Sequence, residues 1–265
     1  IIWYQRENQS GMTSFFNNPN YAACALSTIL PLFYGTLQIN KNLKLKKIIN
    51  LIIIFLIILG IFFTSSRNGL LGLLLGILFF FIPLKSRLLS FSILSVASIF
   101  LFNFLTKYLL NIPLIPLNLA NKISFQGFYN DARLLIWKNS ISYIFKKPFL
   151  GWGGNGFSYL WNNDNALHSH SLPLEISIQY GLISSFLLSS LVIFILVKSF
   201  RVVFLDLNFK LRNSGKESFD KGWFAAFIVI LFSNLVDIVY FDVRISILFW
   251  LFLAGLRNIS YSKEN

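Results

Sequence analysis

Apolar segments long enough to cross a lipid bilayer recur along this chain, and they restrict its fold more than any other feature. Hydrophobic residues make up 55% of the 265 residues, charged residues make up 12%, and the mean hydropathy is +0.66. A soluble domain needs more charge than this on its surface. Inside a bilayer, a helix satisfies all its backbone polar groups within one segment. The sequence therefore predicts an all-α polytopic membrane protein.

Seven segments reach or approach the roughly 17–25 apolar residues that a spanning helix needs. The third and the last are short, and we expect them to be tilted, extended or partly re-entrant. Pro31 in the first is tolerated because neighbouring helices re-satisfy the backbone groups that a proline frees. The seven predicted spans are 21–39, 48–64, 69–84, 88–105, 172–197, 223–240 and 245–256.

The chain begins at Ile1 without an initiator methionine, a basic n-region or a small-residue cleavage site. We therefore expect no signal peptide, because these are the features that mark one. We also expect the chain to be truncated at its N-terminus, with further spans preceding residue 1.

Lysine and arginine fall mainly on one side of the predicted membrane. The formal net charge of +13 could indicate nucleic acid, but the basic residues form clusters beside apolar segments rather than one patch. We expect membrane lipids, and no nucleic acid, as partners. The positive-inside rule places the loop 41–47 and the C-terminus in the cytoplasm. The stretch 106–171 is then extracytoplasmic.

We predict three parts along the chain. An N-terminal outer segment with four transmembrane helices covers 1–105, a large extracytoplasmic loop covers 106–171, and three transmembrane helices with a cytoplasmic loop and tail cover 172–265. Within the loop, apolar residues at helical spacing predict an interfacial helix over 132–145, with Asn130 and Asp131 at its N-cap.

A glycine-rich stretch at 151–156 follows the predicted interfacial helix. It formally matches G-x-G-x-x-G, the pattern that cradles a dinucleotide pyrophosphate when a strand leads into it. No buried strand precedes the stretch here. We interpret it as a flexible turn or hinge of the loop rather than as a nucleotide site.

The only two histidines, His168 and His170, lie at the outer lip of the predicted span 172–197. Histidine gains and loses its proton near neutral pH, so a histidine at a membrane boundary can act as a base for a lipid-borne substrate. An interfacial polar turn is an equally good interpretation from residue type alone.

Two arginines are candidates for binding a phosphate group. Arg67 lies in a short outer turn, where it could snorkel to lipid phosphate or bind a substrate phosphate through its guanidinium fork, and snorkelling is the simpler reading. Arg133 and Trp137 are four residues apart on one helix face, where the indole could stack on the guanidinium. A solvated arginine is the default for that pair.

The sequence does not present a recognised metal site. His168 and His170 would need further ligands, and the nearby Asp164 and Glu175 do not complete a known spacing. An Asp-x-Asp motif, which holds a divalent ion in many nucleotide-sugar transferases, is absent from the sequence. We predict no metal and no cofactor.

Acidic residues bracket the last outer turn. Asp237 and Asp242 lie on either side of it, with Arg244 beside them. A local ion pair explains this arrangement, while a carboxylate facing the substrate is the alternative. Asp237 and Arg244 are therefore secondary candidates for the site.

Taken in order, these groups resemble the O-antigen ligase and polymerase superfamily, integral membrane enzymes that move glycans from a polyprenyl diphosphate carrier. The chain departs from the family pattern at Ser171, where many members have asparagine, and at Asn68, where glycine or alanine is frequent. The residues that carry the resemblance are Asn17 to Tyr21, Ser66 and Arg67, Arg133 and Trp137 ahead of Pro148, Gly151, Gly153, Gly156 and Phe157, and then His170, Ser171, Leu174 and Gly181.

The resemblance implies a metal-independent, inverting glycosyltransferase of the inner (plasma) membrane, whose active site faces the periplasm or the cell exterior. It implies that His170 is catalytic and accepts the proton of an acceptor hydroxyl. Arg67 and Arg133 would bind the donor diphosphate, and His168 and Trp137 are secondary candidates. The implied partners are a polyprenyl diphosphate-linked glycan and a lipid or glycan acceptor.

Three alternatives remain. A polymerase, or a transferase that glycosylates protein, would use the same donor chemistry. A transporter of a small anion would use the two arginines as binding-site charges and His170 as a proton relay. A transporter predicts an internal repeat or paired broken helices, and the sequence shows neither.

Overall fold

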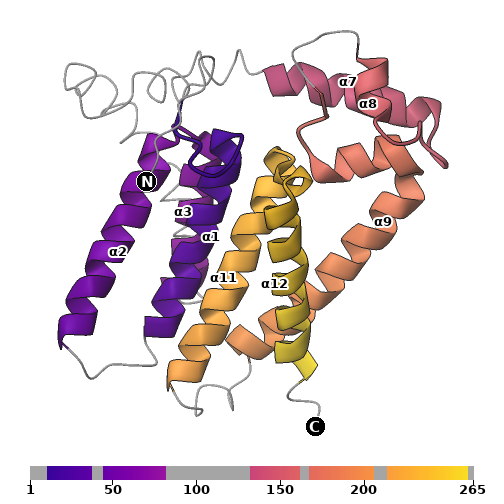
Figure 1. Cartoon of the computed structure of the whole chain (residues 1–265). Helices are drawn as coiled ribbons and strands as arrows, with labels where there is room; N and C mark the ends of the chain where they lie inside the picture. The colour runs from indigo at the N-terminus through magenta and orange to yellow at the C-terminus, as the bar shows by residue number, and fades with distance from the viewer. Residues whose placement is uncertain (1–10, 38–43, 82–131, 162–166, 206–213, 262–265) are drawn as a thin grey trace. The chain divides into compact units, whose positions relative to one another are not determined.

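The computed structural model describes residues 11–37, 44–81, 132–161, 167–205 and 214–261, and within these ranges it contains helices and no strand (Figure 1). Most helices are long and apolar, as the sequence predicts. The α-helices are α1 (Pro19–Leu37), α2 (Lys44–Phe63), α3 (Arg67–Phe81), α7 (Ala132–Lys146), α8 (Gly156–Leu160), α9 (Leu172–Phe200), α11 (Ser214–Val236) and α12 (Val243–Tyr261), with the π-helix η1 (Arg201–Leu205) and the 3-10 helix η2 (Val239–Phe241).

Six of the seven predicted spans coincide with helices. The remaining one, the fourth span at 88–105, lies outside the described residues. Three helical segments are long and apolar enough to cross a membrane: Leu172–Leu205, Glu217–Val236 and Val243–Tyr261. The apolar parts of α2 and α3, Ile48–Phe63 and Arg67–Phe80, are shorter. The all-helical class is confirmed for the described ranges, while the count of seven spans stays a prediction.

The boundaries of the last two predicted spans differ from those of their helices, α11 and α12. The sixth span ends at Val236 and not at Tyr240, because two side chains bind the backbone there: the amide N–H of Ile238 donates to Asp237 and that of Tyr240 donates to Asn234. These bonds compete with the helical ladder and end it. The last span is longer than predicted and runs over Val243–Tyr261.

The structure divides into two compact units, which we describe separately. The first comprises Ile1–Asn130 and Phe200–Ile230, and the second comprises Asp131–Ser199 and Leu231–Asn265. The predicted division at residues 105 and 171 stays a prediction.

In the first unit, α1 packs against both α2 and α3 (Figure 1). Small residues allow the close approach of α1 and α3: a methyl group at Gly69 would lie 2.4 Å from the Cβ of Ala23, and the hydroxyl of Ser27 donates to the carbonyl of Gly69 over 2.8 Å. Such close, hydrogen-bonded contacts are typical of helix packing in membranes. The buried core of these three helices contains Leu30, Ile61 and Leu73.

In the second unit, α7 and α8 pack on the first half of α9. The helix predicted over 132–145 is confirmed as α7, while its predicted N-cap residues, Asn130 and Asp131, lie outside the described residues. A buried apolar cluster joins the three helices and is formed by Ile136, Ile144, Phe157 and Ile178. This cluster fixes α7 beside the start of α9, where the two histidines lie.

A break in α9 at Gly181 anchors the glycine-rich stretch. Gly181 has a φ of 85° and a ψ of 167°, which interrupts the helical hydrogen bonds. The N–H of Trp152 then donates to the carbonyl of Ile178 over 2.7 Å, and the N–H of Leu182 donates to the carbonyl of Pro148 over 2.7 Å. The stretch is therefore bonded to α9 and is not the free hinge that the sequence suggested. A helix, not a strand, precedes it.

Candidate functional site

His170 lies in a tight turn directly before α9 and has a left-handed backbone. Its φ is 52°, a value that costs a non-glycine residue roughly 1–2 kcal/mol. Ser169 beside it is fully buried, and its hydroxyl donates to the carbonyl of Ser171 over 3.1 Å. The strained conformation requires contacts that hold it, because strain of this kind persists only where the surroundings over-determine it.

Glu175, in the first turn of α9, supplies the main contact to this turn. Its Oε2 accepts the backbone N–H of Ser169 over 2.8 Å, and its Oε1 accepts from the side-chain amide of Gln179 over 2.7 Å. The residue is only 3% exposed. No ion pair to Glu175 occurs among the described residues, so these hydrogen bonds and the N-terminal end of the helix dipole compensate its burial. Glu175 therefore positions the turn that carries His170.

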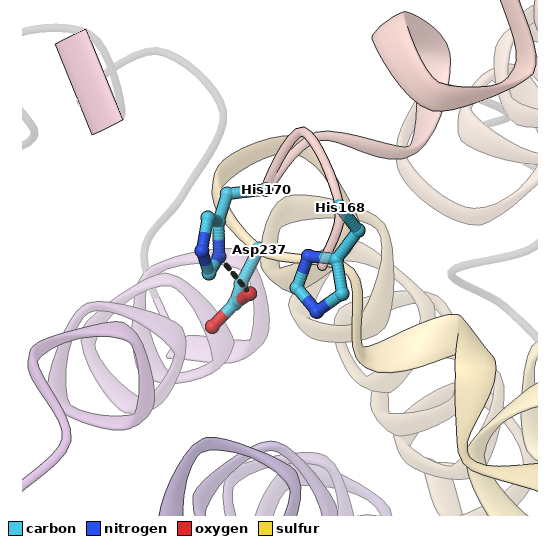
Figure 2. A group of neighbouring side chains, drawn as sticks. All are labelled: His168, His170 and Asp237. Atoms are coloured by element: carbon cyan, nitrogen blue, oxygen red, sulfur yellow. Dashed lines mark hydrogen bonds and ion pairs between the residues drawn. The ribbon is translucent and has the colours of Figure 1, made fainter. Parts of the chain in front are cut away.

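Asp237 faces this turn from the end of α11. Its Oδ1 lies 2.9 Å from Nδ1 of His170 and also accepts the backbone N–H of Ile238 over 2.9 Å. Figure 2 shows the imidazole of His170 directed at the carboxylate, with His168 on the other side of the group. The side chain of Asp237 is 3% exposed. Asp237, a secondary candidate in the sequence analysis, is thus the direct partner of the main candidate, His170.

Arg133, in the first turn of α7, completes the group. One of its terminal guanidinium nitrogens lies 3.3 Å from Oδ2 of Asp237, so the carboxylate contacts His170 with one oxygen and Arg133 with the other. The side chain of Arg133 is 22% exposed. The structure therefore brings together two of the three main candidates, Arg133 and His170, through Asp237.

The protonation state of the pair follows from its surroundings. Burial alone would raise the pKa of Asp237, but the hydrogen bond with His170 and the charge of Arg133 lower that pKa below its ordinary value of 3.8. The carboxylate is therefore ionised at neutral pH and can only accept hydrogen bonds. In neutral His170, the hydrogen must then lie on Nδ1, which leaves Nε2 with a lone pair that can take a proton.

His168 is the third side chain of the group. Its ring and that of His170 are 4.6 Å apart, centroid to centroid, and lie edge to face. Burial, followed by the nearby charge of His170, lowers the pKa of His168 from 6.5. His168 is therefore neutral at pH 7. Its Nδ1 is buried and has no hydrogen-bond partner among the described residues.

The same three side chains could hold a metal ion. His168, His170 and Asp237 each offer one ligand atom, and these atoms lie within 4.8 Å of one another. Sequence spacing did not reveal this set because Asp237 lies 67 positions from His170. The ligand types suit a transition metal more than magnesium or calcium, which prefer oxygen.

Arg67, Arg244 and Trp137 were the remaining candidates from the sequence. Arg67 begins α3 in the first unit, and its expected contact with a diphosphate stays a prediction. Arg244 forms the predicted local ion pair, with a terminal nitrogen 2.6 Å from Oδ2 of Asp242. Trp137 packs against the buried cluster of α7, α8 and α9, and its stacking on Arg133 stays a prediction.

Sequence reasoning missed the positioning role of Glu175 and its partner Gln179. Glu175 entered only as an incomplete metal ligand. The signal was available, because an ionisable side chain within an apolar segment of membrane-spanning length is costly and marks a functional site by default. Both residues are buried, as that rule would suggest.

Comparison with known proteins identifies one family. A family model described as O-antigen ligase matches residues 52–189, just over half of the chain. The matched region contains Arg67, Arg133 and His170 and ends before Asp237. No curated protein shows a significant match to the chain.

Proposed function

Because the chain belongs to the O-antigen ligase family, we propose that it transfers a glycan from a polyprenyl diphosphate carrier to a hydroxyl group of an envelope acceptor. The family match shows glycan transfer of the ligase or polymerase type in a membrane-embedded protein. The donor, the acceptor and the extracytoplasmic location of the reaction in the inner membrane are our proposal. The observation that carries it is the hydrogen bond between His170 and Asp237, with Arg133 on the same carboxylate.

His170 acts as the general base in the proposed reaction. The acceptor oxygen attacks the anomeric carbon of the donor sugar, and its proton passes to Nε2 of His170. The bond between that carbon and the diphosphate oxygen breaks, and the polyprenyl diphosphate leaves with the electron pair. The configuration at the anomeric carbon inverts, because attack occurs opposite the leaving group. Asp237 supports this step by holding the Nδ1 hydrogen and by stabilising the imidazolium that forms.

Arg133 is proposed to stabilise the departing diphosphate. The ion pair with Asp237 orients its guanidinium, a group suited to binding phosphate oxygens. A fixed cation beside a leaving diphosphate supplies the charge stabilisation that metal ions give in other transferases, so the proposed reaction needs no metal. The same role for Arg67 rests on the family resemblance alone.

An apolar pocket beside the histidine turn supports a lipid-linked substrate. Its volume is about 200 Å³, and it lies within the second unit, between the two halves of α9, the end of α11 and α12. Leu172 and Pro173, which line one end, come directly after the turn that carries His170. Hydrocarbon fits such a lining, because apolar surface is favoured against apolar surface.

The transferase proposal is tested with the full-length protein carrying His170→Ala, expressed in a host that lacks its own enzyme. Attachment of lipid-linked glycan to envelope acceptors is scored by gel mobility. We expect transfer to be lost while the protein level is unchanged and the lipid-linked donor accumulates. Asp242→Asn serves as the control, because Asp242 pairs with Arg244 and lies outside the group formed by His168, His170 and Asp237.

Transfer at the wild-type rate in His170→Ala would overturn the base mechanism. The wild-type product also separates the alternatives that share the donor chemistry. A glycan that lengthens while still attached to its carrier would identify a polymerase, and a glycan on protein would identify a protein transferase. Transport of a small anion without glycan transfer would favour the transporter.

A further inference from the structure

Nδ1 of His168, in the group formed by His168, His170 and Asp237, has no role in the proposed reaction. Nδ1 of His168 is buried and has no hydrogen-bond partner among the described residues. A buried polar atom without a partner costs free energy, about 1–3 kcal/mol in proteins. Figure 2 shows this ring facing the same carboxylate as His170, on its other side. An additional atom between the three side chains would satisfy it.

We propose that His168, His170 and Asp237 form a binding site for a divalent transition metal such as Zn²⁺, and that the bound metal inhibits glycan transfer. The three ligand atoms already lie within 4.8 Å of one another. Two imidazole nitrogens and one carboxylate oxygen form a three-ligand set of the kind that leaves a fourth position for water. The binding site stands on this geometry alone, whereas the inhibition rests on the proposed function.

The three ligand atoms are near one another but must rearrange to reach the spacing of a zinc site. Bonds of about 2.0–2.1 Å in a tetrahedral arrangement separate neighbouring ligand atoms by roughly 3.3 Å. Nδ1 of His170 and Oδ1 of Asp237 are 2.9 Å apart, so they need to open by only a few tenths of an ångström. Nδ1 of His168 is the buried atom that needs a partner. The ligand atoms are as much as 4.8 Å apart, so the side chains must also close by roughly 1.5 Å to reach the tetrahedral spacing.

Arg133 sets the strength of this site. It contacts Oδ2 of Asp237 and leaves Oδ1 for a metal, an arrangement in which a second partner orients a ligating carboxylate. Its positive charge also opposes a second cation nearby. We therefore expect reversible binding that is weaker than at a structural zinc site, where the metal stabilises the fold itself.

Metal binding would inactivate the proposed base through its tautomer. A metal on Nδ1 of His170 requires a lone pair there, so the hydrogen moves from Nδ1 to Nε2 by exchange with solvent. The ring stays neutral and no net proton is released. Nε2 then carries a hydrogen and cannot accept the proton of the acceptor hydroxyl. The metal would act as an inhibitor of a reaction that itself needs none.

The site is tested by titrating Zn²⁺ into the full-length protein in lipid nanodiscs by calorimetry, using an affinity tag without histidine. We expect one saturable site in the wild type. His168→Gln and Asp237→Asn should each weaken binding at least tenfold. The matched control is Asp242→Asn, because Asp242 lies at the other end of the turn between α11 and α12, is paired with Arg244 and lies outside the three-residue set. This control should bind like the wild type.

Three results would overturn the site: no saturable binding by the wild type, unchanged binding by His168→Gln, or an equal loss in Asp242→Asn. Inhibition is measured separately, as the ratio of transfer with and without Zn²⁺ within each variant, and EDTA should restore wild-type activity. His168→Gln should need at least tenfold more Zn²⁺ for half-inhibition, and an unchanged requirement would overturn the inhibitory role. Because the titration does not depend on transfer, failure of the proposed function leaves the test of the site intact.

Discussion

Nδ1 of His170 lies 2.9 Å from Oδ1 of Asp237, although the two residues are 67 positions apart in the chain. The contact joins the turn before α9 to the end of α11, and Arg133 binds the second oxygen of the same carboxylate. A histidine with an ionised carboxylate on Nδ1 has its other nitrogen available as a base. We therefore expect the base function of His170 to depend on the carboxylate of Asp237.

Asp237→Asn should lower kcat for glycan transfer on the order of 10²–10⁴-fold, with a smaller change in KM. An amide at this position can donate as well as accept, so it no longer requires the hydrogen on Nδ1, and it cannot stabilise the imidazolium. The measurement is steady-state transfer in nanodiscs with a purified lipid-linked donor. Asp242→Asn makes the same chemical change at the other end of the turn between α11 and α12 and should retain kcat. Equal losses in the two variants would contradict the proposed role.

The second prediction concerns Glu175 and Gln179. Their hydrogen bonds have a defined donor and acceptor, so each substitution has a distinct expected effect. Glu175→Ala should reduce kcat, since it leaves the buried N–H of Ser169 without an acceptor, which costs about 1–3 kcal/mol. Gln179→Glu should also reduce kcat, because it places two buried carboxylates against each other. The double exchange Glu175→Gln/Gln179→Glu should recover much of the loss.

The recovery follows from the donors and acceptors that the exchange preserves. The new amide at position 175 can accept from Ser169 through its oxygen and donate through its nitrogen to the new carboxylate at position 179. Transfer rates and thermal unfolding temperatures of the wild type, Glu175→Gln, Gln179→Glu and the double exchange form a double-mutant cycle. If the double exchange is no better than the worse single variant, the hydrogen bonds do not explain the position of the turn.

The sequence was sufficient to predict the long apolar helices and their membrane character, because apolar length and period are local signals, whereas the short helix α8 was not predicted. It also predicted α7 to within one residue, since Leu134, Trp137 and Ile141 recur at helical spacing. The family resemblance singled out His170 and Arg133. Each of these features can be read within a short window of the chain.

The partner of His170 could not be predicted in the same way. Asp237 was placed inside a predicted span that continued to Tyr240, because the apolar pattern runs on past Val236. Side chains of Asn234 and Asp237 end the helix by binding the backbone, and apolar periodicity does not report such bonds. Contacts between residues far apart in the chain leave no signal in a single sequence.

Alanine substitutions at Gly181 and Gly153 can be compared to test whether the glycine-rich stretch is anchored to α9. Both have positive φ, 85° and 87°, so alanine is strained at either position by roughly 1–2 kcal/mol. A methyl group at Gly181 would also lie 1.9 Å from the carbonyl oxygen of Phe149, whereas one at Gly153 meets nothing within 4 Å. Gly181→Ala should therefore destabilise the protein much more than Gly153→Ala.

The measurement is thermal unfolding in nanodiscs combined with limited proteolysis of the stretch 148–156. Gly181→Ala should lower the unfolding temperature and expose the stretch to protease, since the bonds to Ile178 and Pro148 depend on the break in α9. Gly153→Ala should show a small drop in temperature and little change in cleavage. Similar cleavage of both variants would contradict the anchoring of the stretch to α9.

The buried imidazole of His168 should make the stability of the protein depend on pH. Burial first, and then the charge of His170, lowers the pKa of His168 below 6.5, so the unfolded state takes up a proton at a higher pH than the folded state does. Stability should therefore fall as the pH drops below about 6.5 and level off once the pH is below the folded pKa. Asp237 does not contribute in this range, because its pKa is lowered from 3.8 and it stays ionised.

When the pH is lowered from about 7.5 to about 5.5, the unfolding temperature of the wild type should fall by more than that of His168→Gln. The variant keeps a polar side chain of similar length but cannot take up a proton, so its smaller loss isolates the contribution of His168. His170 and Asp237 are present in both proteins and cancel in the comparison. Unfolding is followed by intrinsic tryptophan fluorescence in nanodiscs at each pH. Equal losses in the two proteins would mean that His168 is not kept neutral by its burial.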